Sequence, residues 1–252
     1  MKLDDDPYSV TATSESRNIL INTAIIVAAG SGRRFGTERP KQFADLLGRP
    51  VIVHTLEKFE RCPAVDEIVL VLSDTGRREF KQLTSAFNFP KLKQIVTGGA
   101  TRAASVSSGL QVIDPATANI VAIHDGARPL VTVAEIEETI RKAEQTGAAC
   151  LVAEILDTIK EIDGESVSRT LDRSRLRRAL TPQAFRYDLI FRAFADADLS
   201  ERITDECLLV ERSGGSVSSV EGSPRNIKIT HGDDLIVAAA LLQMSDSCRS
   251  GV

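Results

Sequence analysis

The chain has 252 residues, a formal net charge of −4, and 42% hydrophobic residues. This composition supplies enough apolar material for a substantial core, and it lacks the basic surplus of a nucleic-acid-binding protein. The four cysteines form no CxxC pair, as is typical of reduced thiols, and the three histidines lack the spacing of zinc ligands.

The two ends of the chain are polar. Segment 1–22 contains the acidic run Asp4–Asp6 and lacks the apolar stretch of a secretory signal. No apolar run reaches the roughly 20 residues that are needed to cross a bilayer. We therefore predict a polar tail over 1–22, a single domain over 23–244, a short tail over 245–252, no membrane association and a cytoplasmic location.

Short apolar runs alternate with helical patterns over the first two thirds of the chain. In chain order, the pattern predicts strand Thr23–Ala28, helix Val51–Phe59, strand Glu67–Leu72, helix Arg77–Phe87, strand Lys93–Thr97, helix Arg102–Leu110, strand Ile120–His124, helix Val133–Thr146 and strand Ala148–Leu156. Because this alternation implies right-handed βαβ units, we expect a Rossmann-like, mostly parallel α/β sheet with helices on both faces.

The next segment breaks the alternation. Residues 159–173 form two polar–apolar alternations around Asp163-Gly164, which predicts a β-hairpin. Two readings remain open, a projecting arm that another subunit stabilises and an ordinary surface hairpin. The basic run Arg175–Arg178 is read as a solvated helix face. The remaining predicted elements are helix Tyr187–Ala197, strands Ser216–Val220 and Ile227–Thr230, and helix Asp233–Gln243.

The loop after the first strand, 29–42, combines glycines with basic side chains. In folds of this class, ligands bind beyond the carboxyl ends of the strands. The glycines allow close approach of backbone N–H groups to a phosphate, and Arg34 and Lys41 suit a polyphosphate. The loop matches neither a Walker A motif nor a GxGxxG fingerprint. Taken alone, it could equally be a flexible loop with solvated charges.

Further blocks along the chain extend this loop into a family pattern. They are Ala28-Ala29-Gly30 with Arg34 and Pro40-Lys41-Gln42, Gly98-Gly99 with Arg102 and Ser105-Val106, His124-Asp125-Gly126-Ala127-Arg128-Pro129, Asp157-Thr158, Asp172-Arg173, Leu180-Thr181-Pro182-Gln183, Thr204-Asp205-Glu206 and Asn226-Ile227-Lys228. In this order, from about Thr23 to Leu242, the chain resembles the 2-C-methyl-D-erythritol 4-phosphate cytidylyltransferases of the non-mevalonate isoprenoid pathway. The family carries alanine at Gly126, a difference that we expect to affect loop stiffness.

The resemblance implies a fold of the nucleotide-diphospho-sugar transferase type and the transfer of CMP from CTP to methylerythritol phosphate. It assigns charge stabilisation to Arg34, Lys41 and Lys228. It assigns nucleotide binding to Ala28, Ala29, Gly30, Ser31, Gly98, Gly99 and Ser105. It assigns polyol phosphate binding to Asp125, Thr158, Arg173, Thr204 and Lys228. It further implies a homodimer with exchanged arms and a Mg²⁺ ion held mainly by phosphate oxygens, with Asp125 as the candidate protein ligand.

Several of these residues have a structural reading as well. Ser105 and Thr204 could each cap or pack a helix, and Arg128 could bind phosphate or form a structural ion pair. We give His124 a structural role, because the attacking phosphate is already ionised and needs no base.

Other functions compete with the leading one. A ribitol-5-phosphate cytidylyltransferase would share the first loop, but the block at Ser105 and Asp172-Arg173 favour methylerythritol phosphate. A nucleotide-binding protein without catalysis would not need the three cations, and a dehydrogenase is disfavoured by the glycine spacing.

Overall fold

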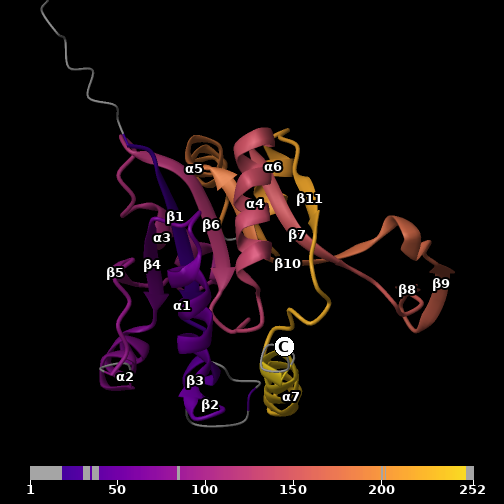
Figure 1. Ribbon diagram of the computed structural model, residues 1–252. Coiled ribbons are helices and arrows are strands. Elements are labelled where there is room, and N and C mark those ends of the chain that lie inside the picture. The colour runs from indigo at the N-terminus through magenta and orange to yellow at the C-terminus, as the bar shows by residue number, and fades with distance from the viewer. Residues whose placement is uncertain are drawn as a thin grey trace, which may run out of the picture.

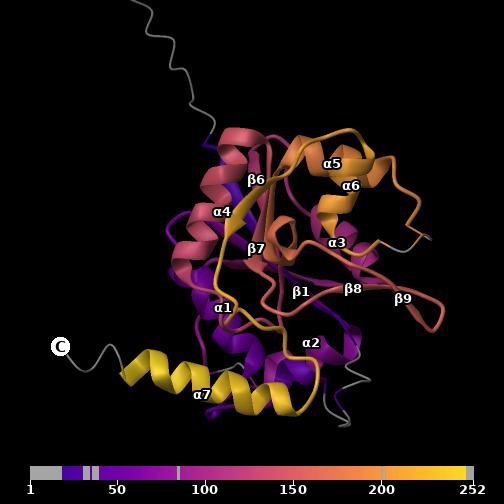
Figure 2. The same ribbon diagram turned by 90° about the vertical axis from the view of Figure 1, so that its right-hand side faces the viewer.

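The computed structural model describes residues 19–30, 35, 40–83, 86–199, 201 and 203–247. Within these ranges, seven strands form one central sheet that is covered by helices on both faces (Figures 1 and 2). The sheet has the order β11-β7-β10-β6-β1-β4-β5. Its strands are β1 (Ile21–Ala28), β4 (Glu67–Leu72), β5 (Leu92–Thr97), β6 (Ala118–Asp125), β7 (Ala148–Glu154), β10 (Arg177–Arg186) and β11 (Ser218–Glu221).

The helices follow the strands in the manner expected of βαβ units. They are α1 (Val51–Arg61), α2 (Asp74–Leu83), α3 (Arg102–Leu110), α4 (Val133–Thr146), α5 (Tyr187–Ala195), α6 (Glu206–Arg212) and α7 (Asp233–Ser247), with 3₁₀ turns η2 (Lys41–Phe43) and η3 (Arg173–Arg175). Two small hairpins pair β2 (Asp45–Leu46) with β3 (Arg49–Pro50) and β8 (Lys160–Asp163) with β9 (Ser166–Thr170). The predicted Rossmann-like α/β fold is thus confirmed.

The sheet is parallel except at one strand. β1 runs parallel to β4 and β6, and β11 runs parallel to β7, whereas β10 lies antiparallel between β6 and β7. The sequence analysis predicted no strand at the position of β10. The reading of Arg175–Arg178 as a helix face was wrong, because Arg177 and Arg178 begin this strand and only its residues from Leu180 to Phe185 are buried.

Apolar side chains on alternate strand positions bind the two helix layers to the sheet. Ile26 of β1 packs into the cluster that contains residues of α1 and α4, whereas Ile25 packs into the cluster of α3, α5 and α6. Phe59 and Phe185 are fully buried, one in each cluster. This division follows from the period of two along a strand, which sends neighbouring side chains to opposite faces.

The C-terminal part of the chain differs from the prediction. Ile227–Thr230 forms no strand: the N–H of Ile229 donates to the carbonyl of Ala127 at 2.8 Å, and the buried side chain joins a third cluster with α7. Helix α7 continues to Ser247, into the predicted C-terminal tail. Helix α2 begins and ends earlier than the predicted Arg77–Phe87.

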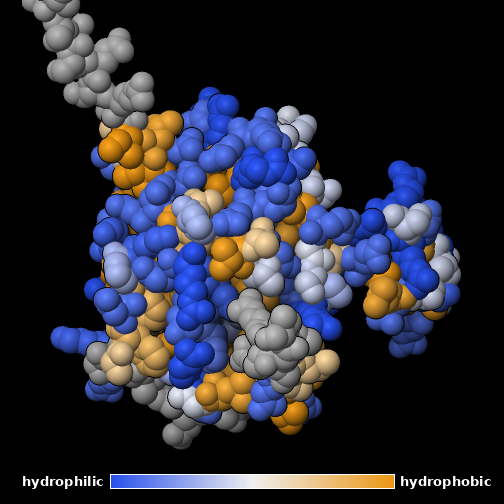
Figure 3. Space-filling view, in the orientation of Figure 1, coloured by the Kyte–Doolittle hydropathy of each residue, from blue (hydrophilic) through white to orange (hydrophobic). Residues whose placement is uncertain are grey.

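The β8–β9 hairpin projects from the body of the protein as the predicted arm (Figure 1). Its turn contains Gly164 at φ 59, in the left-handed region that glycine tolerates. Apolar surface is visible on the projecting arm (Figure 3), where Ile162 and Val167 are 57% and 59% exposed. Among the described residues, no helix is long and apolar enough to cross a membrane.

Candidate functional site

A cavity of about 590 Å³ opens at the carboxyl ends of the central parallel strands. Its walls come from the ends of β1 and β6, from η2, from the loop between β5 and α3, and from the segment before α7. The described lining residues are Val27, Ala28, Ala29, Gly30, Lys41, Gln42, Gly99, Ala100, Thr101, Arg102, Ser105, Asp125, Ala127, Lys228 and Thr230. Blocks that are more than 200 residues apart in sequence therefore meet where the parallel topology predicts a ligand site.

Gly98 and Gly99 bring the loop after β5 close to its neighbours. A Cβ atom at Gly98 would lie 2.5 Å from Ala29 Cβ and 2.7 Å from Ser105 Oγ, and one at Gly99 would lie 2.5 Å from Ala104 Cβ. None of these three distances is tolerated in a packed protein, so close approach explains both glycines. The N–H of Gly98 donates to the carbonyl of Leu72 at 2.8 Å, which fixes this loop at the end of β4.

Ser105 has the packing role that was one of its two predicted roles. Its side chain is 2% exposed, and its hydroxyl donates to the carbonyl of Thr101 at 2.9 Å. Thr101 is the N-cap of α3, because its Oγ1 accepts from the N–H of Ala104 at 3.0 Å. Ser105 nevertheless lines the cavity, so its packing role does not exclude a ligand contact.

Gln42 was part of the quoted Pro-Lys-Gln block, but no role was assigned to it. Its Nε2 donates to the carbonyls of Ala28 at 2.7 Å and Gly30 at 3.3 Å, and its side chain is 2% exposed. These bonds tie η2 to the end of β1 and place Lys41 in the cavity wall. Arg34 and Ser31, also predicted for this loop, lie outside the described residues.

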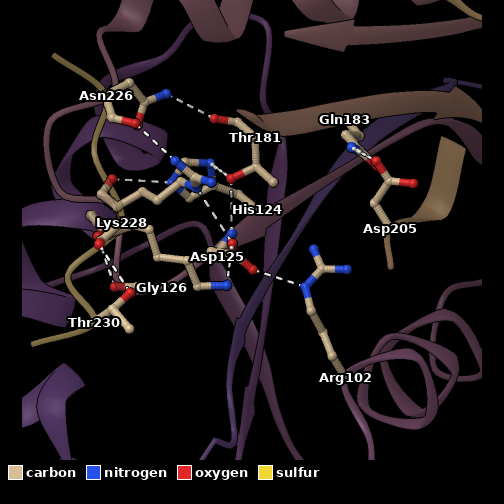
Figure 4. A network of polar contacts seen from close by, with 12 residues as sticks. Arg102, His124, Asp125, Gly126, Thr181, Gln183, Asp205, Asn226, Lys228 and Thr230 are labelled. Atoms are coloured by element: carbon tan, nitrogen blue, oxygen red, sulfur yellow. Dashed lines mark hydrogen bonds and ion pairs between the residues drawn. The ribbon is translucent and has the colours of Figure 1, made fainter. Parts of the chain in front are cut away.

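Asp125 lies at the centre of a cluster of cations (Figure 4). Its Oδ1 accepts from Arg102 Nε at 2.9 Å, while Oδ2 lies 2.8 Å from Lys228 Nζ and 3.4 Å from Arg128 Nε. Burial opposes ionisation of this carboxyl, yet Arg102, Lys228 and Arg128 together hold its pKa well below the ordinary value. Asp125 is therefore an anion that holds three cations together.

Lys228 reaches this cluster because the segment before α7 is fixed at several points. Asn226 Nδ2 donates to the carbonyl of Thr181 at 2.9 Å, and the carbonyl of Asn226 accepts from Arg128 Nη1 at 2.8 Å. On the other side of Lys228, the N–H of Ile229 is bonded to the adjacent loop. The guanidinium of Arg128 therefore forms a structural ion pair with Asp125, which was one of the two roles predicted for it.

His124 is enclosed, in accordance with its structural role. Its Nδ1 lies 3.0 Å from Thr181 Oγ1, its Nε2 lies 3.2 Å from the carbonyl of Arg128, and its ring packs against Phe59. Burial lowers the pKa of His124 to about 3. The neutral ring can donate from Nε2 to the carbonyl and accept from the threonine hydroxyl, so it holds the loop that carries Asp125.

Thr158, Arg173 and Thr204 are not among the described residues that line the cavity. All three are exposed, and Arg173 Nη1 donates to the carbonyl of Leu156 at the base of the arm. Reading Thr204 as a helix cap was wrong, because Asp205 caps α6 by accepting from the N–H of Leu208 at 3.1 Å.

Sequence reasoning also left Arg102 and Glu206 without roles, although both stand in quoted blocks. Arg102 Nη1 lies 2.5 Å from Glu206 Oε1, so the two residues form an ion pair beside Asp125. Nothing in local sequence signals this pair, because its members are 104 positions apart.

Glycine-shaped loops and several cations at the carboxyl edge of a parallel sheet define a nucleotidyltransferase of the α/β class. A model of the family described as 2-C-methyl-D-erythritol 4-phosphate cytidylyltransferase (IspD) matches residues 22–244. The chain belongs to this family.

Individual relatives agree with the family match. The 2-C-methyl-D-erythritol 4-phosphate cytidylyltransferase of Bacillus velezensis is 44% identical over 221 residues, which cover 87% of this chain and 94% of the relative. The protein of the same name from Syntrophotalea carbinolica is 44% identical over 223 residues, covering 86% and 94%. Among solved structures, 4-diphosphocytidyl-2C-methyl-D-erythritol synthase from Anaerococcus prevotii matches with a TM-score of 0.78 and 31% identity, covering 89% and 96% of the two chains.

Proposed function

We propose that this chain transfers CMP from CTP to 2-C-methyl-D-erythritol 4-phosphate, giving 4-diphosphocytidyl-2-C-methyl-D-erythritol and pyrophosphate in isoprenoid precursor biosynthesis. Family membership over residues 22–244 supports this substrate pair. The observation that carries the proposal is the cation cluster around Asp125, which lies in the same cavity as Lys41.

The reaction is an in-line displacement at the α-phosphorus of CTP. A phosphate oxygen of the polyol phosphate forms the new P–O bond, and the bond from the α-phosphorus to the bridging oxygen breaks to release pyrophosphate. Because both reactants are anions, the protein contributes mainly position and charge. Lys41 would hold the triphosphate, and Lys228 would contact the phosphates of both reactants.

Selection of cytosine falls to the loop after β5 in this proposal. Cytosine presents an N4 amine donor and an N3 acceptor, so its recognition requires a fixed carbonyl and a fixed donor. The backbone at Gly98 and Gly99 is packed closely enough to be fixed, and Ser105 lies beside it. Ala28, Ala29 and Gly30 would support the rest of the nucleotide from the end of β1.

Mg²⁺ is expected to enter with the triphosphate. Within the described ranges, no group of three or more His, Cys, Asp or Glu side chains is arranged to hold a metal ion. Asp125 is the one acidic side chain among the described lining residues, and cations already contact both of its oxygens. We therefore propose an ion that would be held mainly by phosphate oxygens, with Asp125 as the candidate protein donor if it exchanges one of its cation contacts; when bound, the ion would neutralise phosphate charge.

We further propose a homodimer in which each arm completes the partner's polyol phosphate site. The exposed Thr158 and Arg173, and the apolar side chains on the projecting arm, support this arrangement. A cytoplasmic location likewise remains a prediction from the sequence.

Mixing two inactive variants tests the arm exchange. A Lys41→Ala subunit keeps its arm, and an Arg173→Ala subunit keeps its cavity. If the arm acts across the interface, a mixed dimer contains one intact site, and random exchange at equal amounts should restore about a quarter of wild-type activity. If each arm serves its own subunit, both sites of a mixed dimer are damaged and mixing restores nothing. Light scattering of the wild type should give a dimer mass; a monomer would contradict the proposal.

A pyrophosphate-release assay tests the activity itself. CTP and Mg²⁺ are supplied with either 2-C-methyl-D-erythritol 4-phosphate or ribitol 5-phosphate. Release is expected with the first substrate, and a clear rate with ribitol phosphate alone would overturn the assignment. Because a hydrophobic pocket discriminates one methyl group by only roughly 10–200-fold, kcat/KM must be compared, not activity at a single concentration.

A further inference from the structure

Glu206 is a carboxylate in an environment where an isolated carboxylate is unfavourable. Its side chain is fully buried, at 0% exposed. Oε1 lies 2.5 Å from Arg102 Nη1, while Oε2 is buried and has no hydrogen-bond partner within the described residues. Burial raises the pKa of Glu206 and so opposes its ionisation, whereas the ion pair and hydrogen bond with Arg102 act in the opposite direction. The pair with Arg102 is therefore the main interaction that stabilises the charged form.

The backbone that carries Glu206 is fixed from two directions. Gln183 Oε1 accepts from the N–H groups of Glu206 at 3.1 Å and Cys207 at 3.3 Å. Gln183 Nε2 donates to Asp205 Oδ2 at 3.0 Å, and Asp205 also caps α6 (Figure 4). The carboxylate therefore extends toward Arg102 from a rigid base.

Arg102 is held between two carboxylates and still lines the cavity. Its Nε is bonded to Asp125 and its Nη1 to Glu206, while 25% of its side chain remains exposed. A guanidinium has five N–H donors in a planar fork. Two fixed bonds determine the plane of that fork, and the remaining N–H donors belong to a side chain that lines the cavity.

We propose that Glu206 is a positioning residue, which orients Arg102 so that its remaining N–H donors bind the triphosphate of CTP. The inference rests on the proposed function, because it takes CTP as the ligand of this cavity. Removing the positioning group should weaken CTP binding, whereas the KM for methylerythritol phosphate should change little.

Glu206→Gln tests the proposal with minimal change of shape. We expect kcat/KM for CTP to fall about 10–100-fold, mainly through KM, because one charge-assisted hydrogen bond to Arg102 is lost. Glu221→Gln is the matched control: Glu221 pairs with Arg177 at 2.7 Å at the surface, and its side chain is 58% exposed. This control should behave like the wild type.

The Arg102→Ala background separates positioning from general packing. If Glu206 acts through Arg102, adding Glu206→Gln to Arg102→Ala should lower kcat/KM by less than about twofold. An equal loss in both backgrounds would overturn the proposal, as would an unchanged KM for CTP in a folded Glu206→Gln protein. Should the Gln variant fail to fold, Glu206→Asp keeps the charge but withdraws it by one methylene; wild-type CTP affinity in that variant would also overturn the proposal.

Calorimetric titration of CTP gives a readout that needs no turnover. If the wild type binds CTP but releases no pyrophosphate with methylerythritol phosphate, the proposed function fails while the Glu206 proposal is still tested by the affinities. If the wild type is active and Glu206→Gln binds CTP with unchanged affinity, the positioning role alone is refuted.

Discussion

Replacing Asp125 with asparagine should lower the stability of the free protein and increase its response to CTP. In the wild type, the carboxylate lies 2.9 Å from Arg102 Nε and 2.8 Å from Lys228 Nζ, with Arg128 Nε at 3.4 Å. Asparagine has a similar shape but no charge and one oxygen acceptor. The three cations would then repel each other without a central anion.

The size of the effect follows from burial. Breaking a buried ion pair by removing one partner costs about 3–5 kcal/mol. The side chains of Lys228 and Arg102 are 36% and 25% exposed, so water compensates part of the repulsion. We expect a loss of about 2–3 kcal/mol, which for a domain of this size lowers Tm by roughly 4–12 °C.

CTP binding should raise the Tm of the Asp125→Asn variant more than it raises the Tm of the wild type. The variant cavity carries one more positive charge, and a triphosphate neutralises it. Thermal unfolding with and without CTP should therefore show a larger CTP-induced rise in Tm than in the wild type, while pyrophosphate release falls because the predicted contact to the polyol hydroxyls is lost.

A surface aspartate provides the control for this experiment. Asp188 lies 3.4 Å from Arg186 Nε and 3.0 Å from Arg192 Nη2, but its side chain is 52% exposed. Asp188→Asn should change stability by less than about 1 kcal/mol. An unchanged Tm in free Asp125→Asn, or a smaller CTP response than in the wild type, would refute the reasoning.

Three further predictions concern other residues. Lys41→Ala should lower kcat by roughly 10²–10³-fold and weaken CTP binding much less, as single-turnover and binding measurements can show; near-normal turnover would mark the lysine as a solvated charge. Burial lowers the pKa of His124 to about 3, and burial also lowers the pKa of His54 from the value near 6.5 of an unfolded chain. The contribution of these histidines to stability should therefore be complete above about pH 6.5 and be lost progressively towards pH 3, since the unfolded chain binds more protons there. In urea unfolding, a His124→Gln variant should lose less stability than the wild type over this pH range. In Gly126→Ala the new Cβ would lie 2.7 Å from Ile52 Cδ1, so we expect a cost of about 1–3 kcal/mol that Ile52→Val partly reverses; an unchanged midpoint in urea would contradict this.

The fold was predictable where local pattern and tertiary role agree. The strand Glu67–Leu72 and the helices Arg102–Leu110 and Val133–Thr146 have the predicted bounds, because an uninterrupted apolar run or a capped amphipathic segment determines each of them. β10 was missed because exposed arginines and a proline interrupt its apolar pattern, and its pairing partners β6 and β7 are distant in sequence. Ile227–Thr230 has the composition of a strand but pairs with no strand among the described residues.

Gly126 is constrained by the packing around it. The sequence suggested an effect on loop stiffness, but its φ does not lie in the left-handed region and its environment is tightly packed. The Cβ of an alanine would meet Ile52 and Ala28. Whether position 126 can hold alanine therefore depends on the size of the side chain at position 52 in α1. No local sequence motif contains this information.

The candidate site was predictable in location but not in its connections. Motifs after parallel strands must meet at one edge, so Gly99, Lys41 and Asp125 were expected to converge. The partners within the site were not foreseeable, because a carboxylate and a guanidinium far apart in sequence are matched only after β10, α3 and α6 have packed. Arg102 and Glu206 show this most clearly, since each stands in a different sequence motif and neither motif indicates that they form a pair.

These connections suggest how a strongly cationic site remains stable before substrate binds. Arg102, Arg128 and Lys228 would repel one another in a partly buried cavity, but Asp125 and Glu206 supply two negative charges among them. These acidic side chains offset part of the positive charge, and the donors of the cluster are already held in place. An incoming triphosphate meets cations that need little reorganisation, and its own charge adds to that of the carboxylates. The two acidic side chains thus serve the site by positioning its cations. Neither has to take part in the chemical step, because the attacking phosphate is already ionised.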